Sequence, residues 1–301
     1  MLQIKLIYLY YYVCQLYSTQ LRWQVQRFSP NNLKGQITDE ELLTIYLFCV
    51  AYQEKYQLKS MYTYIQDHWR TWFPTLPSYQ TFVQRLNRLG ACLPLLVERL
   101  SAQLLRERPA TVQQLVVDSL PIITCSAKRA GKVAPQLTAK GYGASKDLYY
   151  IGCKLHFIGA YRNHRLPIPQ QVGLTPAQVH DLAALRPVLN QFQQTTIIAD
   201  KAYADQEFQR RLQQEQRTAI ITPIKQVKGK AKALKQFDQA ADALFSRAVS
   251  ALKQPLESFF NFLQQKTQIQ VASKVRSVAG LIVHTFGKVA AALLYLLFNN
   301  S

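Results

Sequence analysis

Acidic residues are scarce in this chain. Only 17 of its 301 residues are Asp or Glu, against 36 Lys and Arg, so the formal net charge is +19. That charge opposes compaction by self-repulsion and is hard to explain without a polyanionic partner. Nucleic acid is the favoured partner; an anionic membrane or an acidic protein are the other candidates, and a basic protein without such a partner is the plain alternative. Hydrophobic residues make up 49% of the chain, enough for a substantial core.

Paired cysteines are absent as well. The five cysteines are odd in number, lie far apart and form no C-x-x-C pair: Cys14, Cys49, Cys92, Cys125 and Cys153. This spacing indicates neither a zinc site nor a disulfide framework. A reducing compartment fits the pattern, so we expect a cytoplasmic protein.

No clear signal peptide or membrane span is evident. Residues 4–17 are apolar and rich in tyrosine, but they lack a clear small-residue cleavage site. Residues 281–298 are about long enough to span a bilayer, yet His284 and Lys288 interrupt them on one helical face. We therefore expect a packed C-terminal helix and no membrane partner.

The first hundred residues have the pattern of helices. Thr38 and Glu41 form a T-x-x-E capping box ahead of an apolar segment. Ser78 is placed to cap a second helix over 79–89, which Gly90 would end. A helical region is therefore expected before any sheet.

Strand patterns begin near residue 112. Apolar and β-branched runs predict five strands. Prolines or polar runs separate these strands. The order of elements is three strands, helix, strand, helix, strand, helix, which predicts an α/β fold with a mixed five-stranded sheet and flanking helices. The predicted strands are 112–124, 148–160, 165–176, 195–200 and 218–223, and the helices between the later ones are 177–190, whose N-cap is expected at Thr175, and 205–216.

Two aspartates stand directly after apolar runs. Asp118 follows Leu115–Val117, and Asp200 follows Ile197–Ala199. If these strands are parallel neighbours, the two carboxylates meet at one edge of the core. Carboxylates in a semi-buried site repel each other, and a divalent cation, which prefers oxygen ligands, relieves that repulsion. A turn-forming aspartate is the ordinary alternative for either residue alone.

A third carboxylate lies on a predicted helix over 253–263 that starts near Pro255. Glu257 stands there among aromatic and aliphatic residues. A carboxylate in such surroundings is either partnered or a ligand. The alternative is a glutamate in a first helical turn, where the helix dipole favours it.

These acids and their neighbours resemble a known family. Asp118, Asp200 and Glu257 lie 82 and 57 residues apart and look like the DDE triad of transposases. The segments VVDSLPI, KLHFIG, GLTPAQVHDLAALR, ADKAYAD and KQPLESFFNFLQQKTQIQVASKVRS resemble the insertion sequence 982 family of bacterial transposases, and LPSYQTFVQRLNRL and HWRTWFP resemble its N-terminal region. One departure is Lys253, where the family often has arginine, so charge is kept but bidentate phosphate binding is lost.

The resemblance implies a fold and a domain plan. It implies an RNase H-like DDE catalytic domain over 111–301, with a lysine-rich loop at 224–235 and C-terminal helices. The helical region 1–110 would bind the DNA ends.

The resemblance also implies chemistry and partners. Cleavage and strand transfer would proceed by phosphoryl transfer with two Mg²⁺ ions, or Mn²⁺ as a substitute, and Asp118, Asp200 and Glu257 would be the catalytic metal ligands. One ion would activate water or a DNA 3′-hydroxyl, and the other would stabilise the leaving oxygen. The partners would be double-stranded DNA, as transposon ends and target, and a second copy in a homodimer, in a bacterial cytoplasm near the nucleoid.

A wider set of polar residues is expected around this site. His180 and Asp181 are candidates to orient water or DNA beside the carboxylates, and a solvated position is the alternative for each basic residue. The residues expected to contact DNA are Lys146, Lys154, His156, Lys201, Lys225, Lys228, Lys230, Lys232, Lys253, Arg85 and Arg88.

Two other functions stay open from the sequence. One is a metal-dependent DNA nuclease that cuts without joining, and the other is a DNA-binding protein whose catalysis has decayed. Strand-transfer assays separate the first from a transposase, and metal binding separates the second.

Overall fold

The computed structural model describes most of the chain. The described residues are 2–25, 37–108, 110–128, 132–143, 147–224 and 232–299, without the side chains of Val112 and 232–241. The chain divides into two compact units. Unit 1 contains Met1–Gln103, Ile122–Thr138 and Leu263–Ser301, and unit 2 contains Leu104–Pro121 and Ala139–Phe262. The domain boundary expected near residue 110 stays a prediction.

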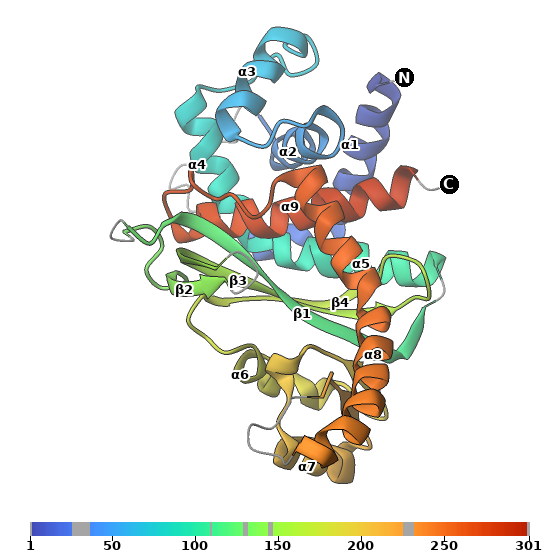
Figure 1. The fold of residues 1–301 in the computed structure, drawn as a ribbon. Helices are drawn as coiled ribbons and strands as arrows, with labels where there is room; N and C mark the ends of the chain where they lie inside the picture. The colour runs from blue at the N-terminus through green and yellow to red at the C-terminus, as the bar shows by residue number, and fades with distance from the viewer. Residues whose placement is uncertain are drawn as a thin grey trace. The chain divides into compact units, whose positions relative to one another are not determined.

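Unit 1 is built mainly from helices, as the sequence predicts for its first hundred residues (Figure 1). Its helices are α1 (Leu2–Thr19), α2 (Asp39–Gln53), α3 (Leu58–His68), α4 (Tyr79–Leu89), most of α5 (Leu93–Glu107) and α9 (Val278–Asn299), with the 3-10 helices η1 (Leu21–Gln24) and η2 (Gly90–Cys92).

The predicted helix caps of this unit are confirmed. The Thr38 hydroxyl accepts a hydrogen bond from the Glu41 backbone at 3.1 Å, and the Glu41 carboxylate accepts one from the Thr38 backbone at 2.6 Å. Ser78 caps α4 by accepting from the Thr81 backbone at 3.4 Å. These side chains satisfy backbone donors that have no partner inside the helix.

Helix α9 is long and apolar enough to cross a membrane, but most of it is buried inside the protein. Its two basic residues find backbone partners: His284 Nε2 lies 2.8 Å from the Ile269 carbonyl oxygen, and Lys288 Nζ donates to the Gln268 carbonyl oxygen at 3.2 Å. A core helix explains this composition, as the sequence predicts.

Unit 2 contains a mixed sheet, so the predicted α/β class is confirmed. The described residues form six strands where five were expected, because the short β2 has no strong apolar pattern. The strand order is β2-β3-β1-β5-β6, and β4 also pairs with β3. The strands are β1 (Thr111–Ser126), β2 (Ala139–Gly143), β3 (Leu148–Tyr161), β4 (Ile168–Pro176), β5 (Thr196–Ile198) and β6 (Ala219–Ile221).

The direction of pairing changes across the sheet. Strand β3 is antiparallel to β2 and β4, whereas β5 is parallel to both β1 and β6. The short helices α6 (Asp181–Leu185) and η3 (Arg186–Gln191) connect β4 to β5, and η4 (Lys201–Tyr203) and α7 (Gln206–Gln216) connect β5 to β6. Parallel strands require such crossovers.

Two helix starts predicted from proline are wrong. The helix after β4 begins at Asp181 with His180 as its N-cap, because Thr175 and Pro176 still belong to β4. Helix α8 runs from Lys232 to Thr267 with Pro255 inside it. Packing of its apolar face outweighs the hydrogen bond that this proline removes.

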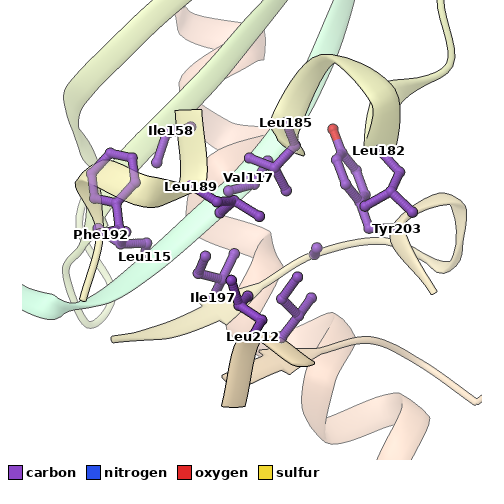
Figure 2. Close-up of a cluster of buried hydrophobic side chains, with 12 residues drawn as sticks. Leu115, Val117, Ile158, Leu182, Leu185, Leu189, Phe192, Ile197, Tyr203 and Leu212 are labelled. Atoms are coloured by element: carbon purple, nitrogen blue, oxygen red, sulfur yellow. The ribbon is translucent and has the colours of Figure 1, made fainter. Parts of the chain in front are cut away.

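A buried cluster covers one face of the sheet in unit 2 (Figure 2). Leu115 and Val117 of β1 point into it, as do Ile197 of β5 and Leu185 of α6, and Figure 2 shows these side chains converging with Tyr203 beside them. The alternation of side chains along a strand therefore sends Val116, between Leu115 and Val117, to the opposite face.

Candidate active site

Asp118 and Asp200 stand at the same level of neighbouring parallel strands. Val116 pairs with Ile198 in the register of β1 and β5, so two residues further on Asp118 is level with Asp200. Parallel strands lie about 4.8 Å apart. The expectation that these strands are parallel neighbours is confirmed, and β1 continues past Asp118 to Ser126, close to the predicted end at residue 124.

Both aspartates lie on the face opposite the buried cluster. Leu115, Val117 and Ala199 belong to that cluster, so side-chain alternation directs Asp118 and Asp200 to the other face. Helix α8 packs on this face. Its Phe259 ring centroid lies 4.7 Å from that of Phe157 on β3.

Lys253 of α8 pairs with the first aspartate. Its Nζ lies 3.1 Å from Asp118 Oδ2, and the Lys253 side chain is 7% exposed against 26% for Asp118. The Ser119 backbone donates to Asp118 Oδ1 at 2.8 Å. Burial raises the pKa of Asp118, while Lys253 lowers it and the nearby charge of Asp200 raises it. The site therefore holds a carboxylate that a positive charge stabilises.

A second polar network begins at the residue after Asp118. The Ser119 hydroxyl donates to Asp181 Oδ1 at 2.9 Å, and the Lys154 ammonium donates to the same oxygen at 3.0 Å. Lys154 also donates to the Val179 carbonyl oxygen at 3.0 Å. This network ties β1, β3 and the start of α6 together through one carboxylate. Sequence reasoning missed Ser119, whose only signal was its position after Asp118.

The remaining two acids are more open to solvent. Asp200 is exposed and accepts a hydrogen bond from the Lys201 backbone at 2.7 Å, which caps η4. Glu257 is exposed on α8, four residues after Lys253 and on the same helical face. Within the described residues, no group of three His, Cys, Asp or Glu side chains stands close enough to hold a metal ion. The convergence of Glu257 with the two aspartates stays a prediction.

The two histidines near the site make local contacts. His156 Nε2 lies 2.7 Å from the Thr175 hydroxyl on β4, and burial lowers the pKa of His156 to about 4, so the ring is neutral near pH 7. His180 is exposed and accepts from the Leu182 backbone at 3.3 Å. His156 therefore offers DNA no positive charge at neutral pH.

Tyr203 is a second residue that sequence reasoning missed. Its side chain is 1% exposed, and its hydroxyl has no hydrogen-bond partner among the described residues. Burial raises its pKa, and the charges of Asp181, Asp118 and Asp200 raise it further. Tyr203 also lines a cavity of about 200 Å³ that Asp181, His156 and Gln171 share. Its place three residues after Asp200 was the available signal.

The residues expected to contact DNA fall into three groups. Arg85 is held by Asp39 at 2.7 Å and by the Ile37 carbonyl oxygen, whereas Arg88 and Lys201 are exposed. Lys154 and Lys253 are paired with carboxylates. Outside the described residues lie Lys146, Lys225, Lys228 and Lys230, and the Lys232 side chain is likewise not described.

Comparison with known families agrees with this arrangement. The family described as "Transposase DDE domain" matches residues 112–279, which is more than half of the chain. The chain belongs to this family of DDE transposases. The match spans all three acids singled out above, and transposition of DNA is the activity of such proteins.

Other comparisons add little to the family assignment. No curated protein matches the chain. A solved structure titled "Crystal structure of a pre-cleavage Mos1 transpososome" is 10% identical and covers 81% of this chain and 83% of its own, with a TM-score of 0.20. At that score the likeness carries no argument for this transposase.

Proposed function

We propose that this chain is a transposase of the insertion sequence 982 group that cleaves the ends of its element and joins them to target DNA. The observation that carries the proposal is the level placement of Asp118 and Asp200 on the face of the sheet that α8 covers. Glu257, one helical turn beyond Lys253 on α8, would complete a catalytic set of three acids.

The residues present fit a divalent cation. Burial and the neighbouring Asp200 raise the pKa of Asp118, so added positive charge would stabilise its ionised form. Carboxylate oxygens are the donors that Mg²⁺ and Mn²⁺ prefer. Asp118, Asp200 and Glu257 would hold two such ions, which supply Lewis-acid stabilisation to oxygens of a phosphate under attack.

The chain's own residues would arrange that chemistry. Lys253 pairs with Asp118 Oδ2 at 3.1 Å and favours its charged form. Ser119 and Asp181 hold the backbone beyond Asp118 through a hydrogen bond of 2.9 Å. Lys154 balances the charge of Asp181, so this second carboxylate does not compete for the ions.

DNA contact would come from exposed basic residues of the described part of the chain and from the lysine-rich segment. Lys201 and Arg88 are exposed, and the lysines of 224–235 belong to the same proposal. Phosphate contacts of this kind supply affinity without base specificity. The partners would be double-stranded DNA and a second copy of the chain, because two DNA ends must be brought together, and the bacterial nucleoid would be the place of action.

Three conservative substitutions test the catalytic set. Asp118→Asn, Asp200→Asn and Glu257→Gln should each reduce strand cleavage at least about 1,000-fold, since each removes one ligand charge from phosphoryl transfer. The assay is cleavage and strand transfer on duplex DNA that carries the inverted repeats flanking the gene, with Mg²⁺ and separately Mn²⁺. DNA binding, measured by gel shift in Ca²⁺, should remain within about threefold of wild type.

Matched controls are available on exposed helical positions. Asp67→Asn on α3 and Glu207→Gln on α7 remove the same charges away from the site and should cleave as wild type does. Wild-type cleavage by any one of the three site variants would remove that residue from the catalytic set. Cleavage without strand transfer in the wild type would identify a nuclease, and binding without either activity would identify a decayed copy.

A further inference from the structure

Helix α1 carries an apolar stripe on its outward face. Leu6, Leu9, Val13 and Tyr17 are buried, with exposed fractions of 0–4%. On the opposite face, large apolar side chains are exposed: Ile4 57%, Ile7 53%, Tyr8 66% and Tyr11 62%. A helix that is apolar all round is normally buried on every side. One side of α1 therefore has the composition of a contact surface.

The stripe has the spacing of a helix–helix contact. Its positions follow i, i+3, i+4 and i+7, which place the four side chains in one row along the helix. They are also symmetric about a point between Ile7 and Tyr8. An antiparallel pair of α1 helices about a two-fold axis there sets Ile4 opposite the partner's Tyr11 and Ile7 opposite the partner's Tyr8.

We propose that two copies of this chain associate through their α1 helices, packed antiparallel along this stripe. In the pair each aliphatic side chain meets an aromatic ring, so the row is complementary to itself, as a two-fold interface requires. The proposal names the surface that forms the homodimer of the proposed function, and it rests on that dimer.

Charge does not oppose a second copy at this stripe, and it argues against a membrane surface. Each copy has a net charge of +19, so association is opposed wherever basic side chains face each other. The only charged residue of α1 is Lys5, and its ammonium donates to Asn299 at 3.0 Å, away from the stripe. Helices that lie on membranes carry Lys and Arg along their polar face, which α1 lacks.

The area is sufficient for a stable contact. Tyr10 flanks the stripe with an exposed fraction of 41%. With side-chain areas on the order of 200 Å², the exposed parts of the five side chains amount to roughly 550 Å² per copy. Two copies would bury about 1,100 Å², just above the roughly 1,000 Å² expected of a biological interface. Such a patch also reaches the largest size usual on monomers.

The first experiment measures mass in solution without DNA or metal, so its outcome does not depend on catalysis. Sedimentation equilibrium of the full chain should show a dimer. Tyr8→Asp and, separately, Ile4→Asp should raise the dimer dissociation constant about 100-fold or more, because each carboxylate would be buried against an apolar side chain of the other copy without a partner. The control Leu244→Asp, at a residue of α8 that is 71% exposed, should leave the dimer unchanged.

The second experiment tests the antiparallel order. Ile4→Cys and Tyr11→Cys chains, in a background lacking the partly exposed Cys14 and Cys125, are mixed and treated with a short bis-maleimide. Crosslinks between the two different variants should exceed those within either variant, and Leu244→Cys should crosslink poorly. A preference for like with like would contradict the antiparallel pair.

Three results would overturn the proposal. The first is a monomeric wild type. The second is a dimer that stays intact in Tyr8→Asp and Ile4→Asp variants whose far-ultraviolet circular dichroism matches that of the wild type. The third is binding of the wild type to neutral phosphatidylcholine vesicles that Tyr8→Asp abolishes. The last result would assign the stripe to a membrane surface. Cleavage activity in any of these cases would leave the proposed function standing.

Discussion

Asp118 and Asp200 each follow by two residues the last register pair of β1 and β5, Val116 with Ile198, so the two aspartates stand at the same level. They lie 82 residues apart in the chain, and the strands that precede them, β1 and β5, pair in parallel. The strands fix the backbones, whereas the side chains depend on local partners. Asp118 has Lys253 and the Ser119 backbone, and Asp200 has the Lys201 backbone.

Lys253 should support both stability and catalysis. Lys253→Met leaves the Asp118 carboxylate, which is only 26% exposed, without its ion pair. We expect the free energy of unfolding to fall by about 1–2 kcal/mol and cleavage to fall more than DNA binding. Lys253→Arg should restore most of both. Urea unfolding and cleavage assays measure the effects, and Lys132→Met, at an exposed lysine, is the control. Equal behaviour of Lys253→Met and the control would contradict this role.

Ser119 should act on the reaction through Asp181. Ser119→Ala removes the hydroxyl that donates to Asp181 Oδ1 at 2.9 Å. Supporting residues of this kind typically contribute 10–100-fold to activity or metal affinity. We expect kcat to fall about 10-fold, the Mg²⁺ concentration for half-maximal rate to rise, and KM for DNA to stay unchanged. Ser119→Thr should recover part of the loss, and Ser126→Ala, at the exposed end of β1, should have no effect. A change confined to KM would argue for direct DNA contact instead.

Replacing Tyr203 should not lower the free energy of unfolding, in contrast to Lys253→Met. Its hydroxyl is buried and lacks a hydrogen-bond partner in the described part of the chain. A buried polar group without a partner costs about 1–3 kcal/mol. Tyr203→Phe should therefore leave the free energy of unfolding unchanged or raise it by about 1 kcal/mol. A loss of more than about 1 kcal/mol in urea unfolding would mean that a bound water in the cavity of about 200 Å³ already satisfies the hydroxyl.

Lys288 predicts a pH dependence of stability. Burial lowers its pKa to about 7 from 10.5, so between these values the unfolded chain binds more protons than the folded chain. The free energy of unfolding should then rise with pH over this range, and the full penalty of the buried charge applies below pH 7. Lys288→Met should flatten this rise and increase the melting temperature at pH 6 by at least about 3 °C.

The measurement for Lys288 is thermal unfolding of wild type and variant at pH 6, 7.5 and 9. Other groups titrate in the same range, so the difference between the two proteins isolates Lys288. Lys274→Met, at an exposed lysine, should follow the wild-type curve. A difference that stays constant with pH would show that Lys288 keeps its charge throughout.

DNA affinity should depend steeply on salt. Basic residues exceed acidic ones by 19, and each phosphate contact releases about 0.9 counterion from duplex DNA. For six to ten contacts, affinity should drop about 1,000-fold or more between 50 and 200 mM salt. Gel shifts across that range measure the slope. A flat response would argue against contact with phosphates.

The sequence predicts local features better than contacts between distant elements. The capping box at Thr38 and the two aspartates after apolar runs were visible because cap chemistry and strand alternation act over a few residues. The helix start predicted near Pro255 was wrong, because burial of α8 overrides a local preference against proline. The Lys253–Asp118 pair joins residues 135 apart, and no periodicity in the sequence encodes such a contact.

Helix α8 is continuous from Lys232 to Thr267, so the distance between two of its residues is fixed by their separation in the sequence. From Lys232 to Lys253, which pairs with Asp118, the helix rises about 32 Å at 1.5 Å per residue. Duplex DNA rises about 3.4 Å per base pair, so this length equals roughly nine base pairs, close to one full turn. A duplex lying along α8 would present nearly the same side to both ends of the helix. Two phosphates contacted from positions that far apart on α8 would then be separated by a fixed number of base pairs, whatever the bases between them.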